Sequence, residues 1–180
     1  YANGQDDDPV RAYNNREDIK SVGHGMTFRR NLRGADDIGI ALTELTDKVS
    51  TRLRRHAKWA RGVKIEITTP EFKRLSRQKR LPNPINSPAA FRKVAFDLIK
   101  ELNYTNRPIR LLTVTAIDLT DSQDGGQLTI FTMGASTDEK NQYDRDENIA
   151  KAMDEIRDKF GNSSIKFAHV IGNDIGIDED

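Results

Sequence analysis

Cationic and hydroxyl side chains recur in the segments of this sequence that have the pattern of strands, and their chemistry suits phosphate binding. Lysine and arginine neutralise phosphate charges, while threonine and serine hydroxyls position a phosphate backbone through hydrogen bonds. We expect one open sheet face to carry this set: Thr27, Arg29, Lys64, Arg77, Lys79, Thr113 and Thr115. Such a face would hold a nucleic-acid backbone. The alternative is an edge strand that its charges keep soluble.

The expected face lacks the means to read bases. It has almost no aromatic side chain on which a splayed base could stack. No helix gathers the Asn, Gln and Arg side chains that read the major groove. We therefore expect sequence-independent, salt-sensitive binding of a duplex.

Charge is distributed unevenly along the 180 residues, although it totals only +1. Residues 20–131 hold 21 basic and 11 acidic side chains, a net charge of +10, whereas residues 1–19 carry −3 and residues 132–180 carry −6. A basic block between acidic ends is typical of a protein that binds a polyanion. A charged, solvated surface would account for the same numbers.

Catalytic and metal-binding patterns are missing from the sequence. The carboxylates nearest a strand end lead into a glycine-rich turn, whose solvation explains them better than a magnesium site: Asp118, Asp121 and Asp124. The three histidines lie far apart: His24, His56 and His169. The chain has no cysteine, which excludes disulfides and thiolate zinc sites. We find no phosphate-binding loop, nucleophile elbow or dinucleotide fingerprint, and predict neither a catalytic nor a metal site.

Membrane and secretion signals are also missing. The hydrophobic residues make up 36% of the chain, and no run approaches the roughly eighteen apolar residues of a membrane span. The first residues, YANGQDDDPV, lack the basic-then-apolar pattern of a signal peptide. We expect a cytoplasmic protein with no membrane partner.

Two helices and four strands must position the phosphate-binding set. Apolar periodicity predicts helices over 35–57 and from Pro88 to Leu102, the second capped by Ser87. Alternation of apolar and polar residues, clean in some segments and interrupted in others, predicts four strands: 20–32, 62–68, 71–81 and 109–119. This order predicts an α+β fold, a two-layer sandwich in which both helices cover one face of a four-stranded, mainly antiparallel sheet.

The acidic C-terminal extension has a pattern of its own. A helix is expected over 141–160, with a narrow apolar stripe: Ile149, Met153, Ile156 and Phe160. A short strand is expected over 165–171, followed by a frayed tail. The helix could pack on this domain, on another domain of a longer parent or on a partner.

In this order, the segments resemble the C-terminal part of a Y-family translesion DNA polymerase of the DinB/UmuC type, in the impB/mucB/samB family. KSVGHGMTF resembles the first strand of that family's little finger domain. RGVKIEIT with FKRLSRQKRLP resembles its middle hairpin, and RPIRLLTVTAIDL its last strand. IAKAMDEIRDKFGNSSIKFAHVI resembles the tail of the UmuC-like branch. The resemblance implies a thumb linker at 1–19, a little finger at 20–131 and an extension at 132–180.

In that family the little finger lies in the major groove and holds the template and primer backbones. With the face predicted above, the resemblance implies these DNA contacts: Ser21, Gly23, His24, Thr27, Arg29, Lys64, Ser76, Arg77, Lys79, Arg110, Thr113 and Thr115. Some relatives carry arginines along the last strand, where this chain has Leu111, Thr113 and Thr115, which implies a weaker hold there.

The family's catalytic carboxylates and two metal ions belong to a palm domain that precedes this region. We therefore expect the fragment to be inactive alone and to hold no cofactor, while the parent polymerase uses magnesium. The remainder of that polymerase is an expected partner.

The segment GGQLTIF, residues 125–131, offers a second partner. The resemblance implies that a sliding clamp binds its peptide through four side chains: Gln127, Leu128, Ile130 and Phe131. The paired glycines would let the peptide lie free. The alternative is that Leu128 and Ile130 continue a strand.

A stand-alone ferredoxin-like RNA-binding or scaffold module is the competing interpretation of the whole chain. It needs aromatic side chains that stack on bases from the sheet, and Phe28 and Phe72 are the only plausible ones.

Overall fold

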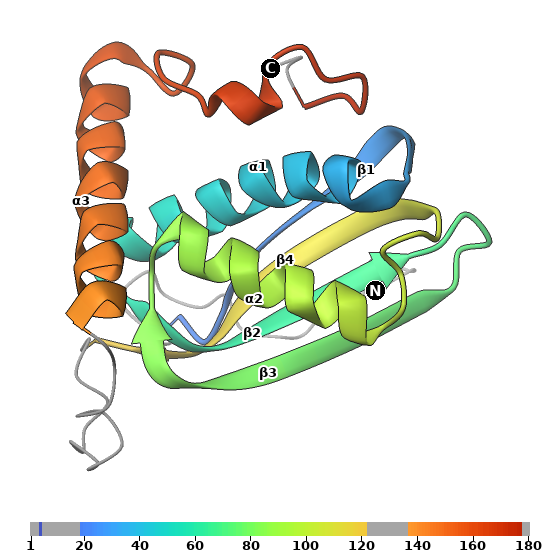
Figure 1. Cartoon of the computed structure of the whole chain (residues 1–180), viewed down its shortest axis with the longest axis horizontal. Coiled ribbons are helices and arrows are strands. Elements are labelled where there is room, and N and C mark those ends of the chain that lie inside the picture. Colours follow the sequence, from blue (N-terminus) through green and yellow to red (C-terminus); the bar gives the residue numbers. More distant parts are fainter. Residues whose placement is uncertain (1–3, 5–18, 122–136, 178–180) are drawn as a thin grey trace.

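The computed structural model describes residue 4, residues 19–121 and residues 137–177 (Figure 1). Its first six elements follow the predicted order: β1 (Val22–Leu32), α1 (Gly34–Arg55), β2 (Trp59–Thr68), β3 (Arg74–Ile85), α2 (Pro88–Glu101) and β4 (Ile109–Thr120). A third helix, α3 (Thr137–Phe160), and a short 3-10 helix, η2 (Ala168–Val170), come after them.

The four strands form one sheet in the order β1-β4-β2-β3, and every neighbouring pair is antiparallel. Figure 1 shows α1 and α2 side by side on one face of this sheet. The predicted two-layer α+β sandwich with a C-terminal helical extension is confirmed.

The core lies between the sheet and its two helices. Strict alternation in β2 and β4 turns every second side chain towards the helices, and these are fully buried: Val63, Ile65, Ile67, Leu112, Val114 and Ala116. The predicted helical stripes meet them: Ile38, Leu42, Leu45, Val49, Leu53, Phe91, Leu98 and Ile99. Burying one such aliphatic or aromatic side chain contributes about 1.5–3 kcal/mol, so this layer stabilises the sheet. Neither α1 nor α2 covers the opposite face of the sheet (Figure 1).

The start of α2 follows its sequence signals. The hydroxyl of Ser87 accepts a hydrogen bond from the N–H of Ala90 at 3.3 Å, and Pro88 occupies the first turn. Just before it, the pairing of β3 with β2 shifts, since Gly62 pairs with Arg80 but Ala60 pairs with Ile85. The extra residues of β3 form an irregularity that leads the chain into α2.

The C-terminal extension packs on α1, which is one of the three places left open by the sequence. Arg157 of α3 forms an ion pair with Asp47 of α1 at 2.8 Å, and each side chain is only 8% exposed. Arg54 of α1 forms a second pair with Asp154 at 2.6 Å. Figure 1 shows α3 standing across one end of α1, with the chain then returning over that helix.

The buried face of α3 differs from the predicted stripe. Ile149, Ile156 and Phe160 are exposed, while Met153 is buried together with Arg157. The helix also begins at Thr137, four residues before the predicted start. The ion pair fixes this orientation, because a guanidinium taken out of water needs a charged partner.

The residues that follow α3 correct two further expectations. The strand expected over 165–171 is replaced by η2, which buries Val170. Residues 172–177 are ordered instead of frayed, because the Asn173 side chain accepts hydrogen bonds from the N–H groups of Ile175 and Ile177. Burial of apolar side chains against α1 therefore stabilises this segment, in place of the strand pairing that the sequence predicted.

Within the described ranges, no helix has the length and apolar character needed to cross a bilayer.

Candidate nucleic-acid interface

Strand register defines the sheet surface that faces away from α1 and α2, which we call the open face. Residues directly opposite each other in antiparallel strands point to the same side. From β1 to β3, three rows cross the sheet: Gly23–Thr115–Lys64–Gln78, Gly25–Thr113–Glu66–Ser76 and Thr27–Leu111–Thr68–Arg74. A fourth row lacks β1: Ile117–Gly62–Arg80.

Glycines bring threonine side chains close to the backbone of β1. A Cβ atom placed at Gly23 would lie 2.9 Å from the Oγ1 of Thr115, and one at Gly25 would lie 3.1 Å from the Cβ of Thr113. Neither glycine can carry a side chain without moving its neighbour. The open face is therefore flat along β1 and β4, with hydroxyls as its most prominent polar groups.

The cations of the open face lie on β2 and β3. Lys64, Arg74 and Arg80 supply three positive charges, and Glu66 supplies one negative charge. The Nζ of Lys64 lies 3.8 Å from a carboxylate oxygen of Glu66, so this lysine is partly compensated. The positive charge is thus greatest at the β3 edge.

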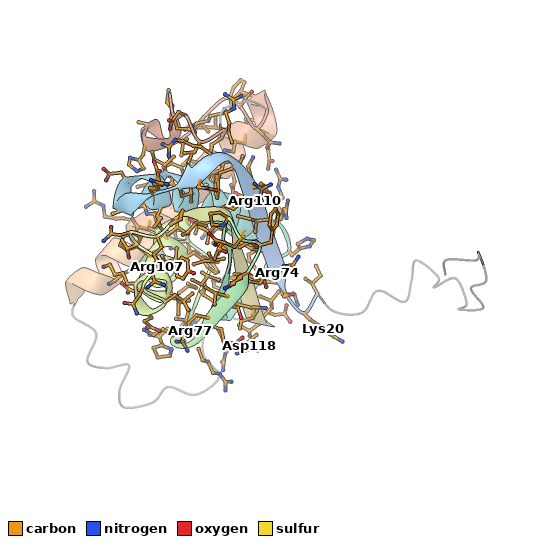
Figure 2. The ribbon with its side chains drawn as sticks, turned by 90° about the vertical axis from the view of Figure 1, so that its right-hand side faces the viewer. Lys20, Arg74, Arg77, Arg107, Arg110 and Asp118 are labelled. Carbon is orange, nitrogen blue, oxygen red and sulfur yellow. The ribbon has the colours of Figure 1, made fainter. Side chains whose placement is uncertain are left out.

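Six of the predicted contact residues lie on the open face: Gly23, Thr27, Lys64, Ser76, Thr113 and Thr115. The predicted position of Arg77 and Lys79 on this face is wrong. Arg77 pairs with Ile65 and Lys79 pairs with Val63, both of which point towards the helices. The two cations are exposed because β3 is an edge strand. Figure 2 shows Arg74 on the far side of the sheet from α2 and Arg77 on the near side.

The other four predicted contacts belong to none of the four rows: Ser21, His24, Arg29 and Arg110. His24 pairs with Val114 and so faces the helices, where burial and then the charges of Arg52 and Lys48 lower the pKa of its imidazole. Arg110 is exposed next to the buried Ile109 at the start of β4 and lies outside the four rows.

Arg29 follows the last regular pair of β1 with β4. Its backbone N–H donates to the carbonyl of Ile175 in the C-terminal extension, at 3.1 Å. Ser21 is exposed one residue before β1 and belongs to no row.

The sequence prediction missed three polar residues of the open face: Arg74, Gln78 and Arg80. The signal that could have found them is Leu75, which pairs with the buried Ile67. If Leu75 faces the core, strand alternation places Arg77 and Lys79 on the helix side of β3 with it. The same alternation places the three missed residues on the open face.

Aromatic side chains are missing from the rows of the open face. Phe28 is buried in the core at 6% exposure, and Phe72 lies in the turn between β2 and β3. The competing RNA-binding interpretation needed one of them on the sheet for base stacking.

Metal-ligating side chains do not gather in groups of three or more among the described residues. Asp121 forms an ion pair with Lys58 at 2.5 Å, and Asp124 lies outside the described ranges. The expected clamp peptide also lies outside them: Gln127, Leu128, Ile130 and Phe131.

These features define a class: a two-layer α+β domain that leaves one polar, modestly cationic sheet face open. Residues 19–130 match the impB/mucB/samB family C-terminal domain. The chain belongs to this family, and the resemblance of its strand segments to that family is confirmed.

Curated relatives extend the similarity into the C-terminal extension. The chain is 28% identical over 172 residues to DNA polymerase IV of Clostridium kluyveri, covering 95% of this chain and 42% of that protein. It is 31% identical over 167 residues to DNA polymerase IV of Acetivibrio thermocellus, covering 92% and 40%. The chain thus spans about two fifths of the length of these relatives.

Solved structures share the fold. A Y-family DNA polymerase chimera of Dbh and Dpo4 superposes with a TM-score of 0.51 at 21% identity, covering 59% of this chain and 30% of that one. At this identity the likeness concerns the fold alone.

Proposed function

We propose that this chain is the DNA-binding part of an error-prone, lesion-bypass DNA polymerase, and that its open face holds the backbone of a primer–template duplex. The relatives named DNA polymerase IV support this proposal, since they match over more than nine tenths of the chain. Polymerisation and the magnesium it uses are proposed for the whole protein.

The observation that carries the proposal is the chemistry of the open face. Hydroxyls of Thr113 and Thr115 stand in the middle of the sheet, over the glycines of β1. Arg74 and Arg80 line the β3 edge of the same face. A phosphate backbone can approach closely where side chains are short, and it meets hydroxyl donors first and cations beside them.

Sequence-independent binding follows from the same residues. The open face offers threonine, serine and glycine, together with flexible cations that match phosphate charge rather than base edges. A duplex presents its phosphates at regular spacing on an outer surface, which a broad polar sheet can follow. The proposal therefore favours duplex DNA over single-stranded RNA.

A salt titration tests this function. The chain should bind a fluorescent duplex of any sequence, and the affinity should fall as salt rises. If the three cations of the open face each neutralise one phosphate, the logarithm of the association constant should fall with the logarithm of salt at a slope of about −3. An affinity that stays constant between low and moderate salt would contradict phosphate-driven binding.

We further propose that residues 127–131 bind a sliding clamp. The support is the pattern QL-x-x-F, which follows β4 after a short interval. Clamp binding by the chain should be lost in a Gln127→Ala/Phe131→Ala variant, because an aromatic anchor and its polar neighbour supply most of such an interface. Equal binding by the variant would contradict this proposal.

A further inference from the structure

An exposed aromatic side chain lies at the end of the sheet where β2 turns into β3. Phe72 is 70% exposed, and its backbone has a φ of 61°. A bulky residue rarely adopts this left-handed conformation, because its Cβ crowds the backbone. Strained residues of this kind persist where the surroundings hold them, and they concentrate at functional positions.

Hydrogen bonds fix the conformation of this turn. The N–H of Thr69 donates to the carbonyl of Lys73, and the N–H of Phe72 donates to the carbonyl of Thr69, both at 2.9 Å. The Thr69 hydroxyl accepts a third bond from the N–H of Lys73 at 3.3 Å. Since Thr69 is itself buried, the exposed ring is presented from a rigid base.

A guanidinium orients the ring. The Cζ of Arg110, at the start of β4, lies 4.9 Å from the centroid of the Phe72 ring. A cation over a ring occupies one of its two faces. With the ring so exposed, its second face is open to solvent, so a flat group could stack there without displacing Arg110.

The charges beside this ring are net positive and favour an anionic ligand, because the single carboxylate of Glu71 stands against Lys73, Arg74 and Arg110. Lys73 follows Phe72 directly, and Arg74 is the outermost cation of the first complete row of the open face at this end. Figure 2 views the molecule from this end and shows Arg74 and Arg110 there. A nucleic acid supplies both a flat aromatic group and negative charge, whereas an aromatic protein side chain supplies only the first.

We propose that Phe72, oriented by Arg110, is a stacking site for an unpaired nucleobase of single-stranded DNA that continues from the duplex on the open face. The proposal rests on the proposed function, because the duplex must lie on the open face. Bases inside a duplex are already stacked on both sides, so away from the duplex ends only an unpaired base offers a face to the ring.

The test compares two DNAs with the same duplex, one blunt and one with a short overhang that carries 2-aminopurine next to the junction. The wild-type chain should bind the overhang DNA about tenfold tighter than the blunt DNA, near the low end of what stacking one base contributes. Its binding should also quench the 2-aminopurine fluorescence.

Two variants isolate the ring. Phe72→Leu keeps an apolar side chain and the same backbone but removes the aromatic face, so the tenfold preference and the quenching should disappear while blunt-duplex affinity is unchanged. Phe72→Trp should keep both signals. Thermal unfolding of each variant checks that it folds.

The outcomes separate the two proposals. If Phe72→Leu binds the overhang DNA as tightly as wild type and with the same quenching, the stacking site is overturned, and a protein partner for this ring becomes the better explanation. If the wild type binds overhang DNA but not the blunt duplex, duplex binding by the open face is contradicted, and with it the path of the strand proposed to reach Phe72. Quenching that still depends on Phe72 would then assign base stacking to the ring alone. Binding to neither DNA would contradict both.

Discussion

At the scale of single residues, a buried ion pair fastens the C-terminal extension to the helical layer. Asp47 and Arg157 are almost inaccessible, and Arg157 also donates to the carbonyl of Ile165. Removing one partner leaves the other charge in a poorly solvated place. Asp47→Ala should therefore lower the free energy of unfolding by about 3 kcal/mol, as measured by chemical denaturation.

A matched control lies at the next residue of α3. Asp158 pairs with Arg55 at 3.2 Å, but both side chains are more than half exposed. Asp158→Ala removes the same kind of charge and should cost less than about 1 kcal/mol. Similar losses in the two variants would show that burial of the Asp47–Arg157 pair is unimportant for stability.

His24 gives the domain a pH dependence that its sequence did not indicate. Its folded-state pKa lies below the ordinary value of 6.5, because burial and the nearby Arg52 and Lys48 disfavour the charged imidazole. As pH falls below 6.5, the unfolded chain binds a proton that the folded chain resists, so stability decreases.

The variant that tests this effect is His24→Gln. Its melting temperature should fall less than that of wild type between about pH 7 and pH 5, because glutamine does not titrate. Melting curves of both proteins across this range provide the measurement. Parallel loss of stability in the two proteins would assign the pH dependence to other groups.

At the scale of elements, β1 and β4 fit together only because β1 is rich in glycine. A side chain at Gly25 would collide with the Oγ1 of Thr113 and crowd its Cβ. Gly25→Ala should therefore cost about 1–3 kcal/mol of stability, the usual range for overpacking. Replacing Thr113 by glycine in the same chain should restore much of this loss. Full stability of the single Gly25→Ala variant would contradict the close packing.

The elements also show what the sequence could and could not predict. Clean alternation in β2 and β4 predicts their buried faces, and Ser87–Pro88 predicts the start of α2. The face of β3 was mispredicted because that strand has a single apolar marker, Leu75, among polar and charged residues.

The packing of α3 could not be predicted because an arginine helps define its buried face. Hydrophobic periodicity counts Ile156 and Phe160 as core and Arg157 as surface, whereas the structure has the opposite arrangement. Only the tertiary contact between Arg157 and Asp47 reverses that expectation.

At the scale of the whole molecule, the acidic extension lies on the helical layer and neutralises cations there. Asp154 pairs with Arg54, Asp158 pairs with Arg55, and Asp174 binds Arg30 beside Asp37. The described part of the extension docks on the α1 side and on the edge at β1. Among the described residues, the extension thus forms ion pairs with Arg30, Arg54, Arg55 and Asp47, and these four lie off the open face.

The most direct test of the open face compares two double variants of one strand. Arg74→Ala/Arg80→Ala removes two positive charges from the open face, and Arg77→Ala/Lys79→Ala removes two from the helix side of β3. Duplex affinity should be measured across a salt series for both. We predict that the first variant binds at least tenfold more weakly, with a salt slope smaller by about 2, while the second stays near wild type. Equal weakening in both variants, or a larger loss in the second, would contradict the assignment of DNA binding to the open face.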